Sequence, residues 1–345
     1  MDITELLDFS VKHNASDLHL SAGVPPIIRV DGDVRKLSLP ALTHTEVHQL
    51  IFDIMNDAQR REYEEKLEVD FSFELPDVGR FRVNAFHQSR GASAVLRTIP
   101  MNIPTLASLN VPEVFYDIAQ LNRGLVLVTG ATGSGKSTTI AALVDYINSN
   151  YQRHILTIED PIEFVHTSKS CLINQREVHR DTLSFQNALR SSLREDPDVI
   201  VVGELRDQET ISLALTAAET GHLVLGTLHT SSAAKTVDRI IDVFPGNDKS
   251  MVRSMLSESL RAVVAQNLLK CTSGGRVACH EVMMATPAIR NLIREDKIAQ
   301  MYSMIQTGSS LGMQTMEQSV KMLVAQGMVA AEEGRRILDS NQRGF

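Results

Sequence analysis

The sequence contains no tryptophan, few aromatic residues and no excess of basic residues, and these shortages narrow its possible functions. Aromatic residues make up 5% of the 345 residues, and 42 acidic residues outnumber 34 basic ones, which gives a formal net charge of −8. A protein that binds nucleic acid along a groove usually offers a basic surface and aromatic side chains on which bases stack. The composition therefore argues against nucleic acid as a partner.

Cysteine and long hydrophobic runs are also scarce. Cys171, Cys271 and Cys279 are odd in number and far apart, so they provide neither a disulfide framework nor the spacing of a four-ligand zinc site. The most apolar runs, 124–128 and 199–202, are far shorter than the roughly 18–20 residues of a membrane-spanning helix. The first residues are acidic, unlike those of a secretory signal. We expect a cytoplasmic protein whose contact with any membrane is peripheral.

Length and proline placement predict two domains. Residues 1–99 predict a small α+β domain, because short strand signals follow one another without a helix between each pair. Pro100, Pro104 and Pro112 indicate a linker over 100–117. The elements expected in the first domain are strands at 16–20, 27–30, 34–37, 69–75, 80–86 and 93–99, a hairpin turn that includes Asp31, and one helix near 44–67.

From about residue 118 the pattern changes to that of an α/β domain. Short apolar strands alternate with helix-sized segments, which is typical of βαβ units and a parallel sheet. The residues from about 248 onward look mostly helical, with breaks at Gly274, Gly275, Pro287 and Gly308. We therefore expect an α/β domain over 118–345 that ends in a helical tail. Its expected strands are 125–129, 155–158, 199–202 and 223–226.

A phosphate-binding loop follows the first of these strands. Residues 130–137, GATGSGKS, match the pattern G-x-x-x-x-G-K-[ST] between an apolar strand and a helix-forming stretch. Glycines let the backbone N–H groups face phosphates, the lysine reaches the β/γ oxygens, and the serine hydroxyl binds Mg²⁺. We expect ATP and Mg²⁺ here, with Ser137 as a metal ligand. The expected nucleotide-binding residues are Gly130, Ala131, Thr132, Gly133, Ser134, Gly135, Lys136, Ser137 and Thr138.

Acidic residues follow two of the other expected strands. Ligands of open α/β sheets bind at the carboxyl ends of the strands. Glu204, after 199–202, and Glu163, after 155–158, are therefore candidates to polarise an attacking water or to hold Mg²⁺ through its water shell. Glu159 and Asp160 are further candidates. For all four, helix capping or simple solvent exposure is the alternative.

Two histidines flank the strand at 223–226. Seven residues of extended chain span roughly 23 Å, and an odd separation places side chains on opposite faces of a strand. His222 and His229 therefore cannot bind one metal ion if the strand is straight. We expect His229, at the carboxyl end, to lie within reach of the γ-phosphate, whereas His222 lies at the other end.

Together these motifs resemble the secretion and type IV pilus motor ATPases over essentially the whole chain. Residues 157–163, TIEDPIE, resemble the family's Asp box, residues 193–204 its atypical Walker B motif, and residues 220–230 its His box. Residues 288–295, AIRNLIRE, resemble a motif typical of the motors that retract pili. The sequence differs from an ordinary Walker B motif at Gly203, where an acidic magnesium-binding residue is often found.

The resemblance implies a PAS-like N-terminal domain, a RecA-like C-terminal domain and a homohexameric ring with ATP at the subunit boundaries. It implies that Glu204 is the catalytic carboxylate and that Glu163 is a second catalytic acid. Arg82 and Arg97 match arginines that approach the γ-phosphate from the N-terminal domain, although arginine on a sheet face is usually only solvated.

The expected function is that of an ATP-hydrolysing motor that powers type IV pilus retraction and twitching motility. The motor would act at the cytoplasmic face of the inner membrane on a platform protein, together with a paralogous retraction ATPase. An accessory paralogue shares most of the motifs and stays open as an alternative. Pilus assembly and secretion ATPases usually carry a further N-terminal domain and a four-cysteine zinc element, for which we expect no room. A RecA-like nucleic-acid translocase is a distant alternative, because the chain is acidic and lacks Trp. A non-hydrolysing nucleotide-binding scaffold is equally distant, because Glu204 is present.

Overall fold

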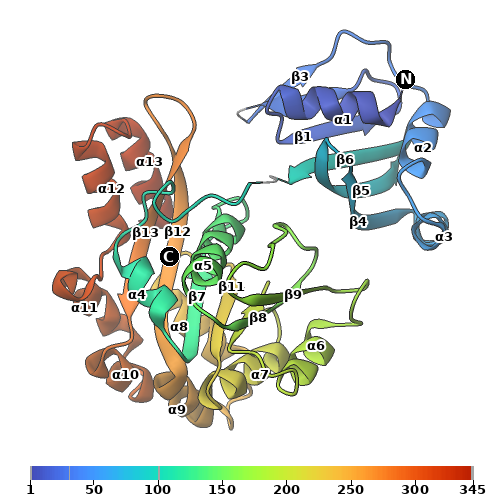
Figure 1. Cartoon of the computed structure of the whole chain (residues 1–345). Helices are drawn as coiled ribbons and strands as arrows, with labels where there is room; N and C mark the ends of the chain where they lie inside the picture. Colours follow the sequence, from blue (N-terminus) through green and yellow to red (C-terminus); the bar gives the residue numbers. More distant parts are fainter. Residues whose placement is uncertain (1, 31, 100–101, 343–345) are drawn as a thin grey trace. The chain divides into compact units, whose positions relative to one another are not determined.

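The computed structural model describes residues 2–30, 32–99 and 102–342, and the chain divides into two compact units at residues 102 and 103. Each unit has its own sheet and its own hydrophobic core (Figure 1). Asp31, expected in a hairpin turn, and Pro100, expected at the start of the linker, lie outside the described residues. In the part of the chain that is described, no helix is long and apolar enough to cross a membrane.

The first unit is an antiparallel sheet with helices packed against it. The strand order is β3-β2-β1-β6-β5-β4. The expected strands are confirmed to within a few residues. The strands are β1 (Asp17–Ser21), β2 (Ile27–Val30), β3 (Asp33–Lys36), β4 (Glu68–Leu75), β5 (Gly79–Gln88) and β6 (Gly91–Ile99), and the helices are α1 (Ile3–Lys12), α2 (His44–Phe52) and α3 (Asp57–Lys66).

The single helix expected near 44–67 was wrong, because two helices form there. Asn56 begins the second one: its side chain accepts hydrogen bonds from the N–H groups of Ala58 and Gln59, and the Gln59 side chain caps the Asn56 N–H in return. Such a capping box starts a new helix and sets its direction. Helix α1 was not predicted, although Ile3, Leu6, Leu7 and Ser10 form a buried face at helical spacing.

The second unit is built on a mixed sheet with the strand order β13-β12-β7-β11-β10-β8-β9. The pairs from β12 through β7, β11, β10 and β8 to β9 are all parallel, whereas β13 pairs antiparallel with β12. The four expected strands are confirmed. The strands are β7 (Gly124–Thr129), β8 (His154–Glu159), β9 (Leu172–Glu177), β10 (Val199–Val202), β11 (Leu223–Leu228), β12 (Leu260–Lys270) and β13 (Arg276–Met284).

The mostly helical tail expected from about residue 248 was wrong in its first part, because β12 and β13 form a long hairpin there. Most residues of β12 are buried. A strand that is buried on both faces reads as one continuous apolar run, which periodicity cannot distinguish from a buried helix. Gly274 and Gly275, both with positive φ, form the turn between the two strands rather than a helix break.

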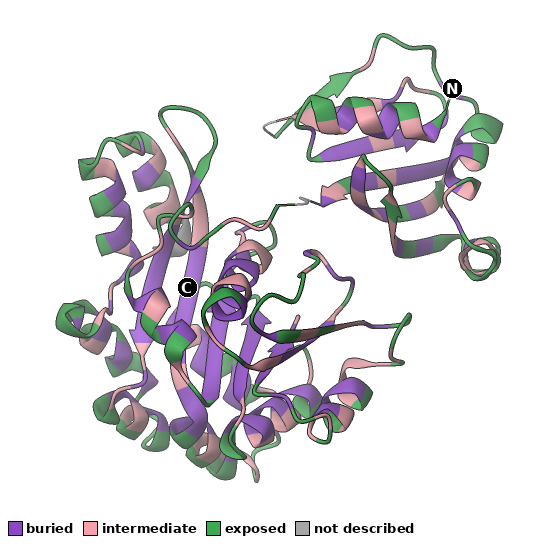
Figure 2. Ribbon diagram, viewed as in Figure 1, coloured by how far each residue is buried: buried purple, intermediate pink, exposed green. Residues whose placement is uncertain are grey.

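Helices cover both faces of this sheet. The sheet contributes alternate side chains to two hydrophobic clusters: Leu125 and Leu127 of β7 belong to one, and Val126 and Val128 to the other. Figure 2 shows the resulting buried interior. The helices are α4 (Val114–Gln120), α5 (Lys136–Asn150), α6 (Phe185–Ser192), α7 (Gln208–Glu219), α8 (Ala233–Asp242), α9 (Lys249–Ser259), α10 (Pro287–Arg294), α11 (Met301–Thr307), α12 (Met316–Ala325) and α13 (Ala331–Gln342).

Helix α10 carries the motif at 288–295 and packs against α9. Ile289 and Ile293 are fully buried, as expected for an amphipathic helix. The charged residues of the motif also make contacts: Arg290 Nε donates to the carbonyl of Ala285 at 2.9 Å, and Arg294 Nε donates to Ser257 Oγ on α9 at 3.1 Å. The motif therefore ties α10 to α9 through polar contacts as well as apolar ones.

The burial of Ile289 predicts its contribution to stability. We expect Ile289→Ala to lower the free energy of unfolding by about 2–5 kcal/mol, because the lost methyl groups leave a cavity in the core. The exposed neighbour on the same helix, Asn291, provides the control, and Asn291→Ala should change stability by about 0.5 kcal/mol or less. Urea denaturation followed by circular dichroism measures both. Equal losses in the two variants would contradict the packing described for α10.

Candidate active site

The parallel register of the second sheet brings the ends of four strands together. Leu127 of β7 pairs with Gly226 of β11, Gly226 pairs with Val202 of β10, and Val202 pairs with Ile158 of β8. Because these residues form one row across the sheet, the segments that follow the four strands meet at one edge. That edge carries the phosphate-binding loop and the segments that begin near 159, 203 and 229.

The phosphate-binding loop connects β7 to α5, as its motif predicts. Gly133 and Gly135 have φ values of +79° and +88°, which L-residues with side chains rarely adopt. Gly130 is needed for a close approach as well, since a Cβ there would lie 2.3 Å from the carbonyl oxygen of Gln266. Ser134 Oγ is buried and has no hydrogen-bond partner among the described residues.

Gln266 of β12 fixes this loop through two side-chain hydrogen bonds. Its role was not predicted from the sequence. Its Nε2 donates to the carbonyl of Ser134 at 2.7 Å, and its Oε1 accepts from Thr139 Oγ1 on α5 at 2.8 Å. The side chain is buried, so both hydrogen bonds are protected from water. The available signal was a glutamine within the apolar run of residues 262–269. It was of no use because a helix, not a strand, was expected over this run.

Lys136 lies at the centre of the site. Its Nζ donates to the carbonyls of Gly130 at 2.8 Å and Ala131 at 3.1 Å, and it lies 3.5 Å from Nδ1 of His229. Burial lowers the pKa of Lys136, and the negative charges of Glu204 and Glu163 act in the opposite direction. The ammonium group of Lys136 therefore interacts electrostatically with Glu204 and Glu163, the two residues expected to be the catalytic carboxylates.

Glu204 and His229 form the next contact. His229 Nε2 lies 3.3 Å from Oε1 of Glu204, and Arg206 Nε lies 2.8 Å from the second carboxylate oxygen. With Nδ1 facing Lys136 and Nε2 facing Glu204, the imidazole connects the lysine to the carboxylate. His229 lies beside Lys136 and Glu204. His222 does not, because its Nδ1 lies 3.0 Å from the carbonyl of Ala217 at the end of α7, with β11 between the two histidines.

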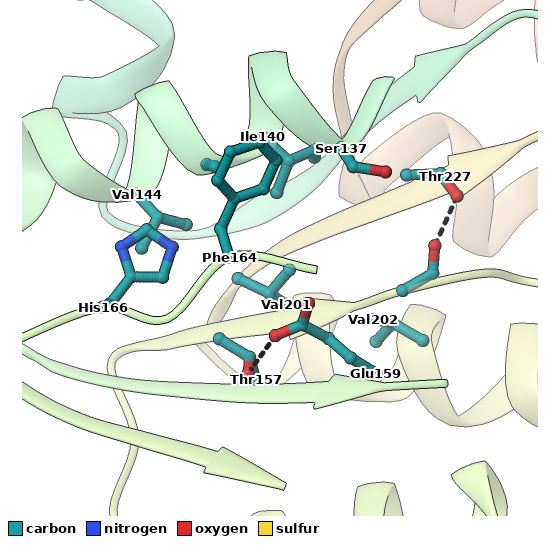
Figure 3. Close-up of a pocket in the computed structure, with 12 residues that line it drawn as sticks. Ser137, Ile140, Val144, Thr157, Glu159, Phe164, His166, Val201, Val202 and Thr227 are labelled. Carbon is teal, nitrogen blue, oxygen red and sulfur yellow. Dashed lines mark hydrogen bonds between the residues drawn. The ribbon is translucent and has the colours of Figure 1, made fainter. Parts of the chain in front are cut away.

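Gly203 allows β8 and β10 to approach each other at the position before Glu204. A Cβ on Gly203 would lie 3.2 Å from the carbonyl oxygen of Ile158 and 3.3 Å from Cα of Glu159. The carbonyl of Gly203 accepts a hydrogen bond from Thr227 Oγ1 of β11 (Figure 3). A side chain at this position would make a tight contact with the backbone of β8, which would have to shift by a few tenths of an ångström.

A small cavity of about 50 Å³ lies beneath the N-terminal part of α5. Ser137, Glu159, Phe164 and His166 are among the residues that line it (Figure 3). Glu159 Oε1 accepts from Thr157 Oγ1 at 2.6 Å, and desolvation raises the pKa of Glu159 to about 7, an effect that the nearby Glu163 charge reinforces. Burial also lowers the pKa of His166 to about 4.

The remaining candidates lie elsewhere. Asp160 is exposed to solvent. Arg82 and Arg97 belong to the first unit, where they are direct partners on β5 and β6. Arg82 Nη2 lies 2.7 Å from Asp70, and Arg97 Nε lies 2.9 Å from Asp17. Like charges opposite each other destabilise an antiparallel pair, and these two ion pairs offset the repulsion between the two guanidinium groups.

The loop, its lysine and the carboxylates at the neighbouring strand ends define a P-loop nucleotide-binding protein. Residues 2–336 match the model of the family described as "Type II/IV secretion system protein". The chain therefore belongs to this family, and it is an ATPase.

Three relatives give the comparison more detail. The type IV pilus retraction ATPase PilT of Pseudomonas aeruginosa is 69% identical over 97% of both chains. The type IV pilus ATPase PilU of the same bacterium is 41% identical over 99% of this chain and 89% of its own. A crystal structure of the pilus retraction motor PilT with bound ADP has a TM-score of 0.89 and 47% identity, and the match covers 97% of this chain and 96% of that one.

The raised pKa of Glu159 predicts a pH-dependent contribution to stability. Between its ordinary pKa of 4.5 and about 7, the folded chain keeps a proton on Glu159 that the unfolded chain releases. Stability should therefore fall as the pH rises through this interval, by about 3 kcal/mol, since one pKa unit corresponds to about 1.4 kcal/mol. Glu159→Gln removes the titration, so the variant should gain this amount relative to the wild type between pH 4.5 and pH 8.

Urea denaturation at several pH values measures the difference between the two proteins. Thr157→Val is the matched control, since it removes one hydrogen bond to Glu159 but keeps the titrating group. The control should keep the fall in stability with rising pH and make it somewhat larger, because the Thr157 hydrogen bond lowers the pKa of Glu159. Parallel stability curves for the wild type and Glu159→Gln would show that this carboxyl group does not titrate in the expected range.

Proposed function

We propose that this chain hydrolyses ATP at the loop 130–138 with Glu204 as its catalytic carboxylate. The chain is a type IV pilus retraction ATPase, and this hydrolysis supplies the energy for retraction and twitching motility. The observation that carries the proposal is the chain of contacts from Lys136 through His229 to Glu204. The 69% identity with the retraction ATPase PilT, against 41% with PilU, favours the retraction motor over an accessory paralogue.

The residues of the loop fit a triphosphate with Mg²⁺. Three positive-φ glycines and the start of α5 provide backbone N–H groups for phosphate oxygens, and Lys136 provides a cation. The buried hydroxyl of Ser134, which lacks a partner among the described residues, is a donor available to the phosphates. Ser137 would hold Mg²⁺, which neutralises charge on the β- and γ-phosphates when bound.

The carboxylates then act on water. Glu204 accepts a hydrogen bond from the attacking water and takes up its proton, which makes the water a better nucleophile. His229 orients Glu204 by donating from Nε2 while Nδ1 accepts from Lys136. Glu163 is a second catalytic acid whose charge acts on the same lysine.

The proposal extends to the assembly. The first unit is the PAS-like domain over about 1–99, the linker spans 100–117, and the RecA-like domain spans 118–345. Six copies form a ring, in which Arg82 and Arg97 approach the γ-phosphate bound to a neighbouring copy. The ring acts at the cytoplasmic face of the inner membrane on a platform protein, together with a paralogous retraction ATPase. The ion pairs of both arginines with Asp70 and Asp17 keep their guanidinium groups ordered on one face of the sheet.

Binding and hydrolysis should separate at Lys136 and Glu204. Lys136→Ala should lose nucleotide affinity, because the lysine contacts phosphate in the ground state. Glu204→Gln should bind ATP normally but lose about 10²–10⁴ in turnover, because polarisation of water matters mainly in the transition state. A fluorescent ATP analogue measures affinity, and phosphate release measures turnover.

In cells, Glu204→Gln should produce surplus pili and abolish twitching motility. Leu183→Ala, at an exposed position outside the phosphate-binding loop, serves as the control for expression and handling. Wild-type turnover in purified Glu204→Gln would exclude this carboxylate as the catalytic one. Cells without pili would point to assembly rather than retraction.

The arginines should act in trans. An arginine that reaches the γ-phosphate is worth about 10³–10⁵ in rate, so Arg97→Ala alone and Lys136→Ala alone should both be nearly inactive. Mixed rings should regain part of the activity, because some boundaries then combine an intact loop with an intact arginine. Phosphate release from mixtures checked by native mass spectrometry measures this. Inactive mixed rings would place Arg97 outside catalysis between subunits.

A further inference from the structure

The side chain of Gln175 joins β9 to a segment that has no regular structure. Residues 160–171, between β8 and β9, form neither helix nor strand in the described chain. Gln175 Nε2 donates to the carbonyl of Phe164 at 2.9 Å, and its Oε1 accepts from the N–H of His166 at 2.7 Å. The amide group therefore pairs with the backbone of the segment as a neighbouring strand would.

The carboxyl group of Glu159 completes this network. Its Oε1 lies 3.2 Å from Gln175 Nε2 and accepts from Thr157, which pairs with Gln175 in the register of β8 and β9. The same carboxyl group accepts a hydrogen bond from the backbone N–H of Glu163. Gln175 and Glu159 thus hold the backbone at residues 163, 164 and 166.

The segment held in this way carries Glu163 and packs beneath the phosphate-binding loop. Phe164 is buried, and its ring and the imidazole of His166 line the cavity next to Ser137 (Figure 3). The charge of Glu163 acts on Lys136. Because secondary structure does not position this segment, the hydrogen bonds of the network set where the Glu163 backbone lies.

We infer that Gln175 is a positioning residue for ATP hydrolysis, which holds Glu163 in its place beside the phosphates by clamping residues 163–166 to Glu159. The inference rests on the catalytic role proposed for Glu163. A displacement of about 1 Å at a reacting group costs on the order of 10² in rate. A second anchor, the hydrogen bond from the N–H of Ile162 to Glu177 at 3.0 Å, keeps the segment attached when the clamp is lost.

Gln175→Met tests the clamp, because methionine keeps the length of the side chain but removes its hydrogen bonds. We expect kcat for ATP hydrolysis to fall about 10–100-fold while KM changes less than about threefold. Asn174→Ala is the matched control, since Asn174 lies next to Gln175 on the same strand and bonds His154 at 2.9 Å on the other face. The control should keep wild-type kcat. If Asn174→Ala lowered kcat as much as Gln175→Met, the loss would come from a general disturbance of β9, and the inference would be overturned.

A double-mutant cycle with Glu163→Gln separates positioning from a general structural effect. Because Gln175 acts through Glu163, Gln175→Met should cause no further loss of kcat in the Glu163→Gln background. Multiplied losses would overturn the inference and leave the role of Glu163 intact. Wild-type kcat in Glu163→Gln alone would overturn the role of Glu163 itself, and the inference with it.

If Gln175→Met does not fold, Gln175→Glu replaces it in the double-mutant cycle. Glutamate preserves the size of the side chain and the acceptor for the N–H of His166, but it loses the donor to Phe164 and places a second carboxyl group next to Glu159. We expect the same loss of kcat and the same absence of a further effect with Glu163→Gln. Wild-type kcat in Gln175→Glu would overturn the inference.

Discussion

The hydrogen-bonded register of β7, β11, β10 and β8 is the constraint on which the site depends. Parallel strands align residue by residue, so a shift of one residue would move every side chain to the other face. The row from Leu127 to Ile158 sets where each strand ends. Glu204 and His229 reach the phosphate-binding loop because of that alignment, although they are far from it in the sequence.

Small residues and side-chain amides then hold the strand ends at the required distances. Gly203 lets β10 approach β8, and Gln266 ties the loop to β12. Each of these contacts is buried or partly buried, where an unpaired polar group would cost about 1–3 kcal/mol. The same cost explains why Lys136 bonds carbonyls of its own loop and lies near His229. The site is therefore built in advance by the sheet and its polar contacts.

The extent to which the sequence predicted the fold varied with the kind of signal. The strand at 199–202 was predicted with its correct bounds and three other buried parallel strands to within two residues, because each is a short apolar run with polar ends. The hairpin of β12 and β13 was missed because a buried strand and a buried helix share the same composition. The break between α2 and α3 depends on the capping box at Asn56. This local signal was not recognised, because residues 44–67 were read as one helix.

The candidate site divides in the same way. Residues within one contiguous motif, from Gly130 to Thr138, were predictable because their chemistry depends on local backbone shape. Lys136, Glu204 and His229 were also named from the sequence, since strand ends of a parallel sheet converge. The roles of Gln266 and Gln175 were not predicted, because they depend on which backbone atoms lie within 3 Å after folding.

The sequence by itself determined the nucleotide loop, the alternation of strands and helices, and the residues available for catalysis. Only the tertiary structure decided which of those residues meet, since that depends on strand order and register. It placed His229 between Lys136 and Glu204 and left His222 at the end of α7. The physical reason is that backbone shape is set by neighbours along the chain, whereas a side-chain contact is set by packing between segments that are distant in the sequence, as for Lys136 and His229 at a separation of 93.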